Sequence, residues 1–269
     1  MSAIAILAAF LRRDWMIDTS YRATFALELL ATLFLLTLFF YLSHVVDEAQ
    51  FSAQQNLSSG YFGFAAVGLA LLEILQVSLT SFSRKLREEQ TTGTFEALMA
   101  SPASPSLIIL SSAAYDLLRA TFDALVLLLA AVTIFGLEMH TDAGSAAVAT
   151  ATLLGSVGLF ASLGVTVAAL TVIIKRAAGI SGIAITGLAL LGGVYFPIDV
   201  MPEPLHFLAE ALPFTWALDV LRASLLGGET DPAQVAGLFA SVAVLLPLSL
   251  VGFGAAVTRA RRTGSLAQY

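Results

Sequence analysis

The chain has 269 residues, of which 58% are hydrophobic and 12% are charged. Soluble domains contain about half apolar and about a quarter charged residues, so this composition indicates a membrane protein with several spans. The net charge of −6 disfavours nucleic acid as a partner, and the lack of cysteine excludes disulfides, thiolate metal sites and cysteine nucleophiles.

A short helix is expected first, over residues 1–22. This stretch mixes apolar side chains such as Leu7 and Trp15 with Arg12, Arg13 and Asp14. It is too charged and too short to cross a bilayer, whose core requires about 20 apolar residues. We therefore expect it to lie in the membrane interface.

Apolar runs then predict six spans. They cover residues 23–46, 60–82, 105–136, 146–174, 180–195 and 233–257, of which the fifth is short for a full crossing. With six spans, eleven of the thirteen Lys and Arg residues fall on one side of the membrane. The positive-inside rule makes this side the cytosol and places both termini there. We expect a single all-α transmembrane domain over residues 1–269.

Small residues four positions apart recur in the fourth and sixth predicted spans and permit close approach of helices. Packing within the chain is the first interpretation, and a subunit interface is the second. The pairs are Ala151 and Gly155, Gly158 and Ser162, and Gly252 and Ala256.

One long charged stretch, residues 83–105, separates the second and third predicted spans. Helix-start residues and an i, i+3, i+4 apolar stripe predict a short amphipathic helix there. Such a helix is either a docking surface for a cytosolic protein or a solvated loop on lipid headgroups. The start residues are Thr92, Gly93 and Thr94, and the stripe is Phe95, Leu98 and Met99.

Ionisable residues inside the predicted spans suggest a polar path. Each ion at the bilayer centre costs about 2.5 to 3.5 kcal/mol, so these side chains should avoid lipid. Helical spacing puts Asp116, Arg119 and Asp123 on one face, where they could neutralise one another. The alternative is a structural network that fixes helix packing. The candidate path residues are Glu28, Glu73, Asp116 and Arg119.

Residues 196–228 are helical in pattern but interrupted by prolines. They predict two short helices joined at Pro213, which form a re-entrant hairpin outside the cytosol, buried in protein or lining a cavity. Asp219 and Arg222 are three residues apart and should pair. A packed cap without a gating role is one interpretation of this hairpin.

Catalytic motifs are missing from the sequence. A phosphate-binding loop needs glycines before its lysine, which Lys85 and Lys175 lack, and no serine lies in a G-x-S-x-G elbow. The three histidines share no metal-ligand spacing. We expect neither an enzyme nor a metal site, and energy must come from a partner or an ion gradient.

Two motifs resemble those of the permease subunits of ABC-2 type transporters. The first is the family's E-x-E-x-G-T-x-E-x-L-x-x-x-P run, here with Thr91 in place of the second acid. The second is its proline-rich block before the last span. They are carried by Glu89, Gly93, Thr94, Glu96, Leu98 and Pro102, and by Gly193, Phe196, Pro197, Pro202, Pro213, Thr215 and Arg222.

The resemblance implies that residues 83–105 contain a coupling helix, which inserts into a separate ATPase subunit that binds ATP and Mg²⁺. It implies two ATPase copies, a second permease copy, a bacterial or archaeal cell membrane, and export of a hydrophobic drug, antibiotic or lipid-like compound. Export of a lipid-linked polysaccharide is the alternative, followed by an ion-coupled transporter or channel. The implied coupling residues are Glu89, Gly93, Thr94, Phe95, Glu96, Leu98 and Met99, and the implied outer gate is Phe196, Pro197, Pro202, Pro213 and Arg222.

Overall fold

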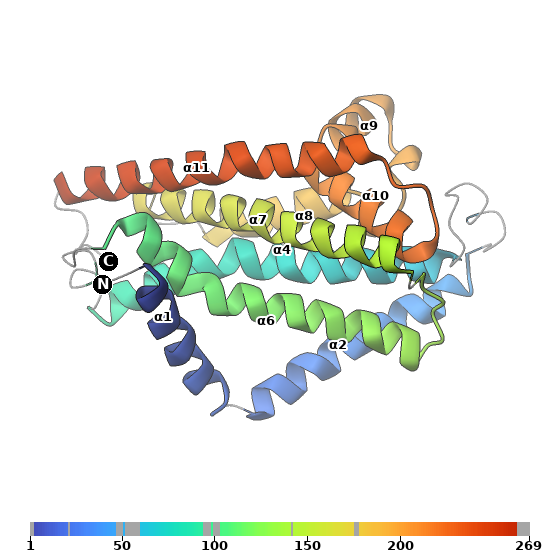
Figure 1. The fold of residues 1–269 in the computed structure, drawn as a ribbon, viewed down its shortest axis with the longest axis horizontal. Coiled ribbons are helices and arrows are strands. Elements are labelled where there is room, and N and C mark those ends of the chain that lie inside the picture. Colours follow the sequence, from blue (N-terminus) through green and yellow to red (C-terminus); the bar gives the residue numbers. More distant parts are fainter. Residues whose placement is uncertain are drawn as a thin grey trace.

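A computed structural model describes residues 3–20, 22–46, 51, 60–93, 98, 103–140, 142–174 and 178–262. Every regular element in these ranges is helical, as Figure 1 shows. The elements are α1 (Ala3–Asp18), α2 (Arg22–Ser43), α4 (Gly60–Thr91), α6 (Pro105–Thr133), α7 (Ala143–Ile174), α8 (Ala178–Leu191), the 3₁₀ turn η1 (Ile198–Val200), α9 (Glu203–Glu210), α10 (Pro213–Leu226) and α11 (Pro232–Arg262).

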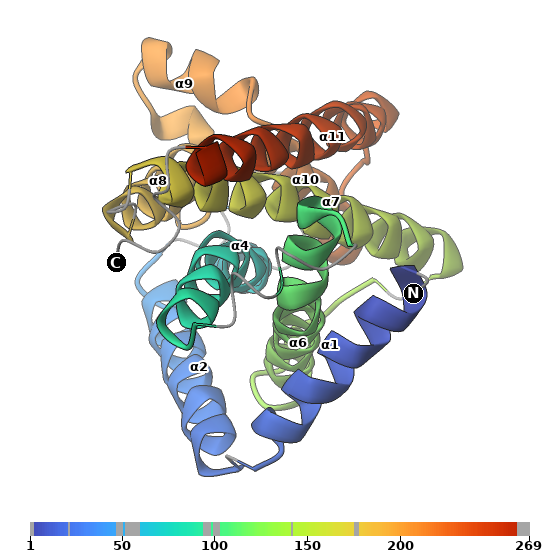
Figure 2. The same cartoon turned by 90° about the vertical axis from the view of Figure 1, so that its left-hand side faces the viewer.

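The helix α4 forms the centre of the bundle. Its residues 60–72 are all buried, as expected for a helix that is apolar on every side. The helices α6 and α7 pack against it, and α11 lies along α7 (Figures 1 and 2). We call the end of the bundle where α4 ends and α6 begins the α1 end, and the opposite end the α10 end.

Three helices in the described part of the chain are long and apolar enough to cross a membrane. They are α4 over Gly60–Glu89, α7 over Ala143–Ile174 and α11 over Pro232–Ala260. At 1.5 Å per residue each exceeds the ~30 Å of a bilayer core. Large apolar side chains on the outer faces of the bundle, such as Phe34 and Val251, are about 70% exposed, which suits contact with lipid. The chain is an integral membrane protein.

Glycines allow α7 to approach its neighbours closely. A Cβ atom on Gly158 would lie 2.9 Å from Val242 of α11, and one on Gly164 would lie 2.3 Å from the carbonyl oxygen of Ser78 in α4. Packing within the chain therefore explains the small residues of the fourth predicted span. Gly252 of α11 has nothing within 4 Å of its Cβ position, so it mediates no close approach among the described residues.

The described helices follow the predicted spans, with one correction in the charged stretch. The second predicted span ends at residue 82, whereas α4 continues to Thr91, supported by the i, i+4 ion pair of Arg84 and Glu88. Thr92 and Gly93 follow as a turn, with Gly93 at φ +75°. Gly93 therefore ends a helix in the manner of a C-terminal glycine, and the prediction that Thr92 and Gly93 begin one is wrong.

The two short helices expected in residues 196–228 are present. Pro202 directly precedes α9, and Pro213 is the first residue of α10, where its missing N–H breaks no helical hydrogen bond. Figure 2 shows α9 projecting from the bundle. By contrast, α10 packs between α4, α7 and α11.

Candidate functional site

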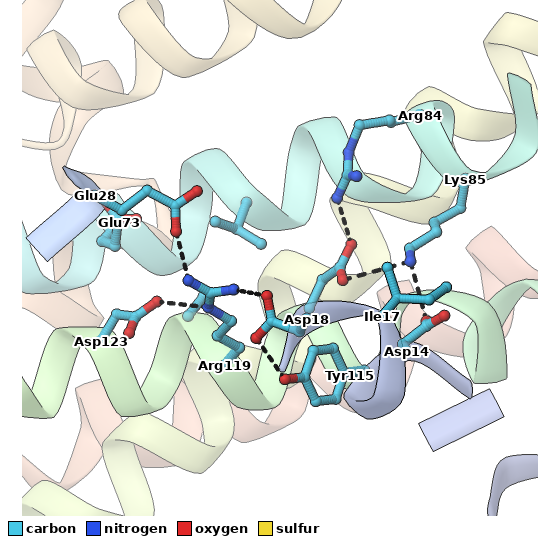
Figure 3. A pocket seen from close by; sticks show the side chains of 13 residues that line it. Asp14, Ile17, Asp18, Glu28, Glu73, Arg84, Lys85, Tyr115, Arg119 and Asp123 are labelled. Carbon is cyan, nitrogen blue, oxygen red and sulfur yellow. Dashed lines mark hydrogen bonds and ion pairs between the residues drawn. The ribbon is translucent and has the colours of Figure 1, made fainter. Parts of the chain in front are cut away.

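A charged cavity of about 380 Å³ lies between α1, α2, α4 and α6 (Figure 3). Acidic residues outnumber basic ones in its lining, so the cavity carries an excess of negative charge. The charged lining residues are Asp14, Asp18, Glu28, Glu73, Asp116 and Asp123, with Arg84, Lys85 and Arg119.

All four candidate path residues line this cavity. Glu28 comes from α2, Glu73 from α4, and Asp116 and Arg119 from α6. Residues far apart in the chain thus meet at one site, which the sequence alone did not establish.

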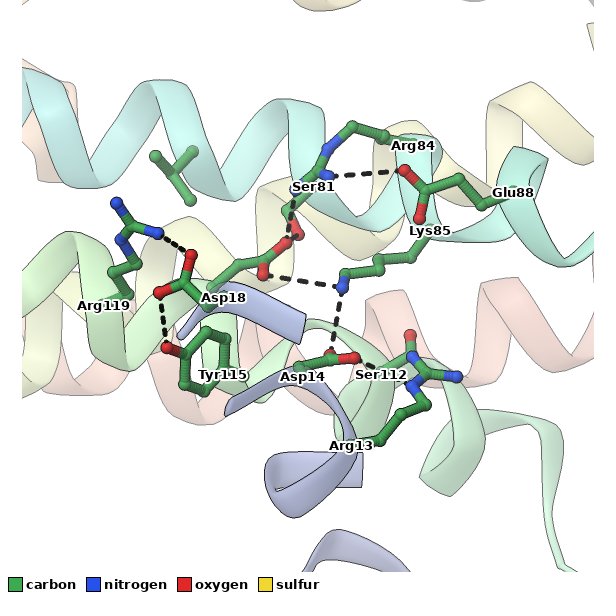
Figure 4. A network of polar contacts seen from close by, with 12 residues as sticks. Arg13, Asp14, Asp18, Ser81, Arg84, Lys85, Glu88, Ser112, Tyr115 and Arg119 are labelled. Carbon is green, nitrogen blue, oxygen red and sulfur yellow. Dashed lines mark hydrogen bonds and ion pairs between the residues drawn. The ribbon is translucent and has the colours of Figure 1, made fainter. Parts of the chain in front are cut away.

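Asp14 and Lys85 form the most buried ion pair of the site (Figure 4). The Lys85 Nζ atom lies 3.0 Å from Asp14 Oδ2, and the two side chains are 11% and 2% exposed. Arg13 donates to the other Asp14 oxygen at 2.8 Å. Charges removed from water are tolerated only when they are paired, so these contacts fix α1 against α4.

Arg119 joins three helices. Its guanidinium pairs with Asp18 of α1 and Glu28 of α2, and its Nε lies 3.5 Å from Asp123 Oδ2 in its own helix. Tyr115 donates to Asp18 Oδ2 at 2.7 Å and fixes the acceptor. Because the same guanidinium binds both α1 and α2, a displacement of either helix would change the contacts of the other.

The predicted triad on α6 forms only in part. Arg119 and Asp123 pair as expected. Asp116 turns instead to α4, where Arg84 Nη2 donates to it at 2.7 Å and the Ser81 hydroxyl also donates. The Asp116 side chain therefore faces α4 and not Arg119, and it links α4 to α6.

Glu73 differs from the other charged lining residues. It lies on α4, half-buried, and faces the cavity. Among the described residues, no hydrogen bond or ion pair reaches its carboxylate. Its negative charge is therefore available to a ligand or to water in the cavity.

The coupling residues are described in part. Glu89 accepts a hydrogen bond from Arg13 Nη1 at 2.7 Å, so the start of the charged stretch is tied to α1. Leu98 is helical and packs against the apolar cluster that contains Phe82 and Phe253. The remaining coupling and motif residues lie outside the described ranges; they are Thr94, Phe95, Glu96, Met99 and Pro102.

Arg222 is buried in α10 and holds the backbone of two other segments. It donates to the carbonyl oxygens of Phe64 at 3.2 Å, Gly193 at 2.9 Å and Val194 at 3.2 Å. Its guanidinium carbon lies 3.4 Å from the centre of the Phe64 ring. Among the described residues it forms no ion pair with Asp219, so that prediction is wrong: the planar guanidinium is satisfied by carbonyl oxygens instead.

The other candidate gate residues lie between the end of α8 and the first residue of α10. Phe196 and Pro197 are half-buried and directly precede η1, while Pro202 is exposed before α9. Pro213 starts α10 nine residues before Arg222. The structure therefore puts these residues at the α10 end, with Arg222 as their anchor to α4.

Asp14, Asp18 and Tyr115 belong to the site but were not among the predicted site residues. Asp14 and Asp18 lie four residues apart, so they share one face of α1, and that spacing was readable from the sequence. Their basic partners lie more than seventy residues away, at Lys85 of α4 and Arg119 of α6, and only the placement of α1 against these two helices brings them together.

The chain was compared with known proteins. The family model described as ABC-2 type transporter matches residues 3–226, a range that includes the cavity and the helices α9 and α10. A search of the curated proteins found no match.

Proposed function

Because the chain belongs to the ABC-2 type transporter family, we propose that it is the permease subunit of an ATP-driven exporter of a hydrophobic drug, antibiotic or lipid-like compound. In this proposal a separate ATPase subunit, present in two copies, binds ATP and Mg²⁺. A second permease copy, identical or paralogous, completes the path. The complex lies in a bacterial or archaeal cell membrane.

We propose six spans, formed by α2, α4, α6, α7, α8 and α11, with α1 in the membrane interface. The α1 end faces the cytosol, as do both termini. The basic residues Arg84, Lys85 and Arg87 support this orientation, because they lie near the α1 end, while the loop before α11 carries Glu229 and Asp231.

Two groups of ion pairs, joined by the helix α1, lead from the charged stretch to the cavity and carry the proposal. Glu89 binds Arg13, and the adjacent Asp14 binds Lys85. Further along α1, Asp18 binds Arg119, which lines the cavity with Glu28. An ATPase that docks on residues 83–105 and displaces the end of α4 would therefore move α1 and change the cavity.

The hairpin of α9 and α10 would form the outer gate. In the proposal, closure of the ATPases tilts the spans and releases the gate residues Phe196, Pro197, Pro202, Pro213 and Arg222. The contact of Arg222 with Phe64 supports this role, because it connects α10 to the same helix, α4, whose other end carries the coupling segment.

The test compares ATP hydrolysis by the reconstituted permease–ATPase complex with and without a transported compound. We expect Arg13→Gln and Glu89→Gln each to lower compound-stimulated hydrolysis about tenfold, equivalent to about 1.4 kcal/mol of coupling. The exchanged pair Arg13→Glu with Glu89→Arg should recover part of it. Replacing Gly93 and Glu96 together should abolish stimulation while the permease stays inserted.

Glu229→Gln is the matched control, since Glu229 is exposed, lies outside residues 83–105, and receives no hydrogen bond or ion pair from the described residues. Full stimulation in the Glu89 and Gly93 variants would contradict the coupling role. Transport by the purified chain without any ATPase would overturn the proposal as a whole.

A further inference from the structure

An apolar groove runs between α1 and α6, beside the charged cavity, with which it shares Asp18, Tyr115 and Arg119. Its volume is about 810 Å³, within the ~300 to 1,000 Å³ typical of ligand pockets. Leu11 and Trp15 of α1 form one wall, and Leu118 and Phe122 of α6 form the other. Trp15 is 60% exposed. Its ring packs edge-on against the ring of Tyr115, with 6.4 Å between the ring centroids, and this contact orients Trp15 in the groove.

The groove continues as an exposed apolar stripe along α6. Five residues at alternating spacings of four and three share this face, and they are between 37% and 62% exposed. The stripe leads away from the α1 end, along the direction of the bundle. Its members are Leu118, Phe122, Leu125, Leu129 and Val132.

The groove has one positive charge that nothing in the described chain offsets. Arg12 lines it, is exposed, and has no hydrogen bond or ion pair with any described residue. The two other charged lining residues, Asp18 and Arg119, pair with each other, so neither is the partner of Arg12. A ligand that fits must therefore be anionic at the Arg12 position and apolar along α6.

We propose that this groove binds an anionic phospholipid, with its phosphate at Arg12 and an acyl chain along the α6 stripe. Three features match such a lipid: a cation at one end, apolar walls that continue along a helix, and a tryptophan of the kind found at membrane interfaces. A second copy of the chain would also cover apolar residues at this spacing, but it would leave Arg12 without an explanation. The inference depends on the membrane location of the chain and not on its proposed transport activity.

Trp15 can report occupancy directly. The chain has two tryptophans, and Trp216 lies in α10, so Trp216→Phe leaves Trp15 as the only one. The full chain is reconstituted in phosphatidylcholine vesicles with rising fractions of brominated phosphatidylglycerol, or with brominated phosphatidylcholine as the neutral reference. Bromine quenches tryptophan fluorescence on contact, so the two curves give the relative affinity.

We expect brominated phosphatidylglycerol to quench Trp15 with about fivefold preference, equivalent to the ~1 kcal/mol of one basic residue at a membrane surface. Arg12→Gln should remove the preference, and Arg12→Lys should retain it. Arg87→Gln, an equal charge change at an exposed site of α4, should leave it unchanged.

Equal quenching by the two lipids, or a preference that survives Arg12→Gln, would overturn the inference. A combined result would also overturn it: neither lipid quenches Trp15, and two copies of the Leu118→Cys variant cross-link to each other. The cross-link would identify position 118, because the chain has no other cysteine. That second result would assign the groove to a partner copy.

Discussion

Replacing Lys85 by methionine should destabilise the bundle by about 2 to 3 kcal/mol. Breaking a buried ion pair by removing one partner typically costs about 3 to 5 kcal/mol, because the remaining charge stays buried. The structure argues for less here, since Arg13 still donates to Asp14 at 2.8 Å and Arg84 still donates to Asp116 at 2.7 Å. Methionine preserves the unbranched apolar stem of lysine, so the loss isolates the charge.

The double variant Lys85→Met with Asp14→Leu should lie within about 1 kcal/mol of the wild type. Replacement of a whole buried pair by apolar side chains of similar volume is often neutral. Arg13, which loses Asp14, keeps Glu89 as a partner and is 38% exposed to solvent. The double-mutant cycle therefore yields a coupling energy of about 2 kcal/mol between the two positions.

The free energy of unfolding can be measured by titration of the micelle-bound chain with SDS, followed by circular dichroism of the helices. Arg87→Met is the control, because this exposed residue has no described partner, and it should change stability by less than about 0.5 kcal/mol. A Lys85→Met variant as stable as the wild type, or a double variant as unstable as the sum of the two single variants, would refute the reasoning.

Three further predictions test other contacts. In the same titration Gly164→Ala should destabilise the bundle by about 2 kcal/mol or more, because its Cβ atom would lie 2.3 Å from a carbonyl oxygen of α4. Gly252→Ala is its control and should be neutral, because nothing lies within 4 Å of the Cβ position there. Arg222→Met should destabilise the bundle by about 2 to 4 kcal/mol, because three backbone carbonyl groups lose their hydrogen-bond donor. Proteases should then cleave α9 and α10 faster, and an unchanged cleavage rate would contradict the role of Arg222 in anchoring α10 to α4. Glu73→Gln should lower transport by the reconstituted complex while stability stays within about 0.5 kcal/mol, and full transport would remove Glu73 from the path.

Hydropathy and segment length were sufficient to predict where the long helices lie. A bilayer requires long apolar runs, whichever helices those runs later pack against. The family motifs were sufficient for the family, which the match over residues 3–226 confirms. The second span is predicted to end at residue 82, where the charged stretch begins, whereas the helix α4 continues beyond that residue. Arg84 and Glu88 instead extend the helix beyond the apolar run to Thr91.

Side-chain partners were the part that local spacing could not supply. Asp116 and Arg119 are three residues apart on α6, yet Asp116 binds Arg84 of the adjacent helix α4, with 2.7 Å between Arg84 Nη2 and Asp116 Oδ2. Arg222 likewise prefers carbonyl oxygens of α4 and of the turn after α8 to Asp219, in a site that excludes water. Both outcomes depend on which helices are adjacent, and periodicity within one helix does not contain that information.

The central claim is that an ATPase subunit docks beside the end of α4 and drives the cavity through α1. Since the chain has no cysteine, a single cysteine introduced at the exposed Thr92 can be tested with a short cross-linker in the reconstituted complex with the proposed ATPase. A cysteine at the exposed Asp231, near the α10 end, is the matched reference. We expect a cross-link from Thr92 and none from Asp231; a cross-link from Asp231 alone, or from neither position in a complex that hydrolyses ATP, would contradict the claim.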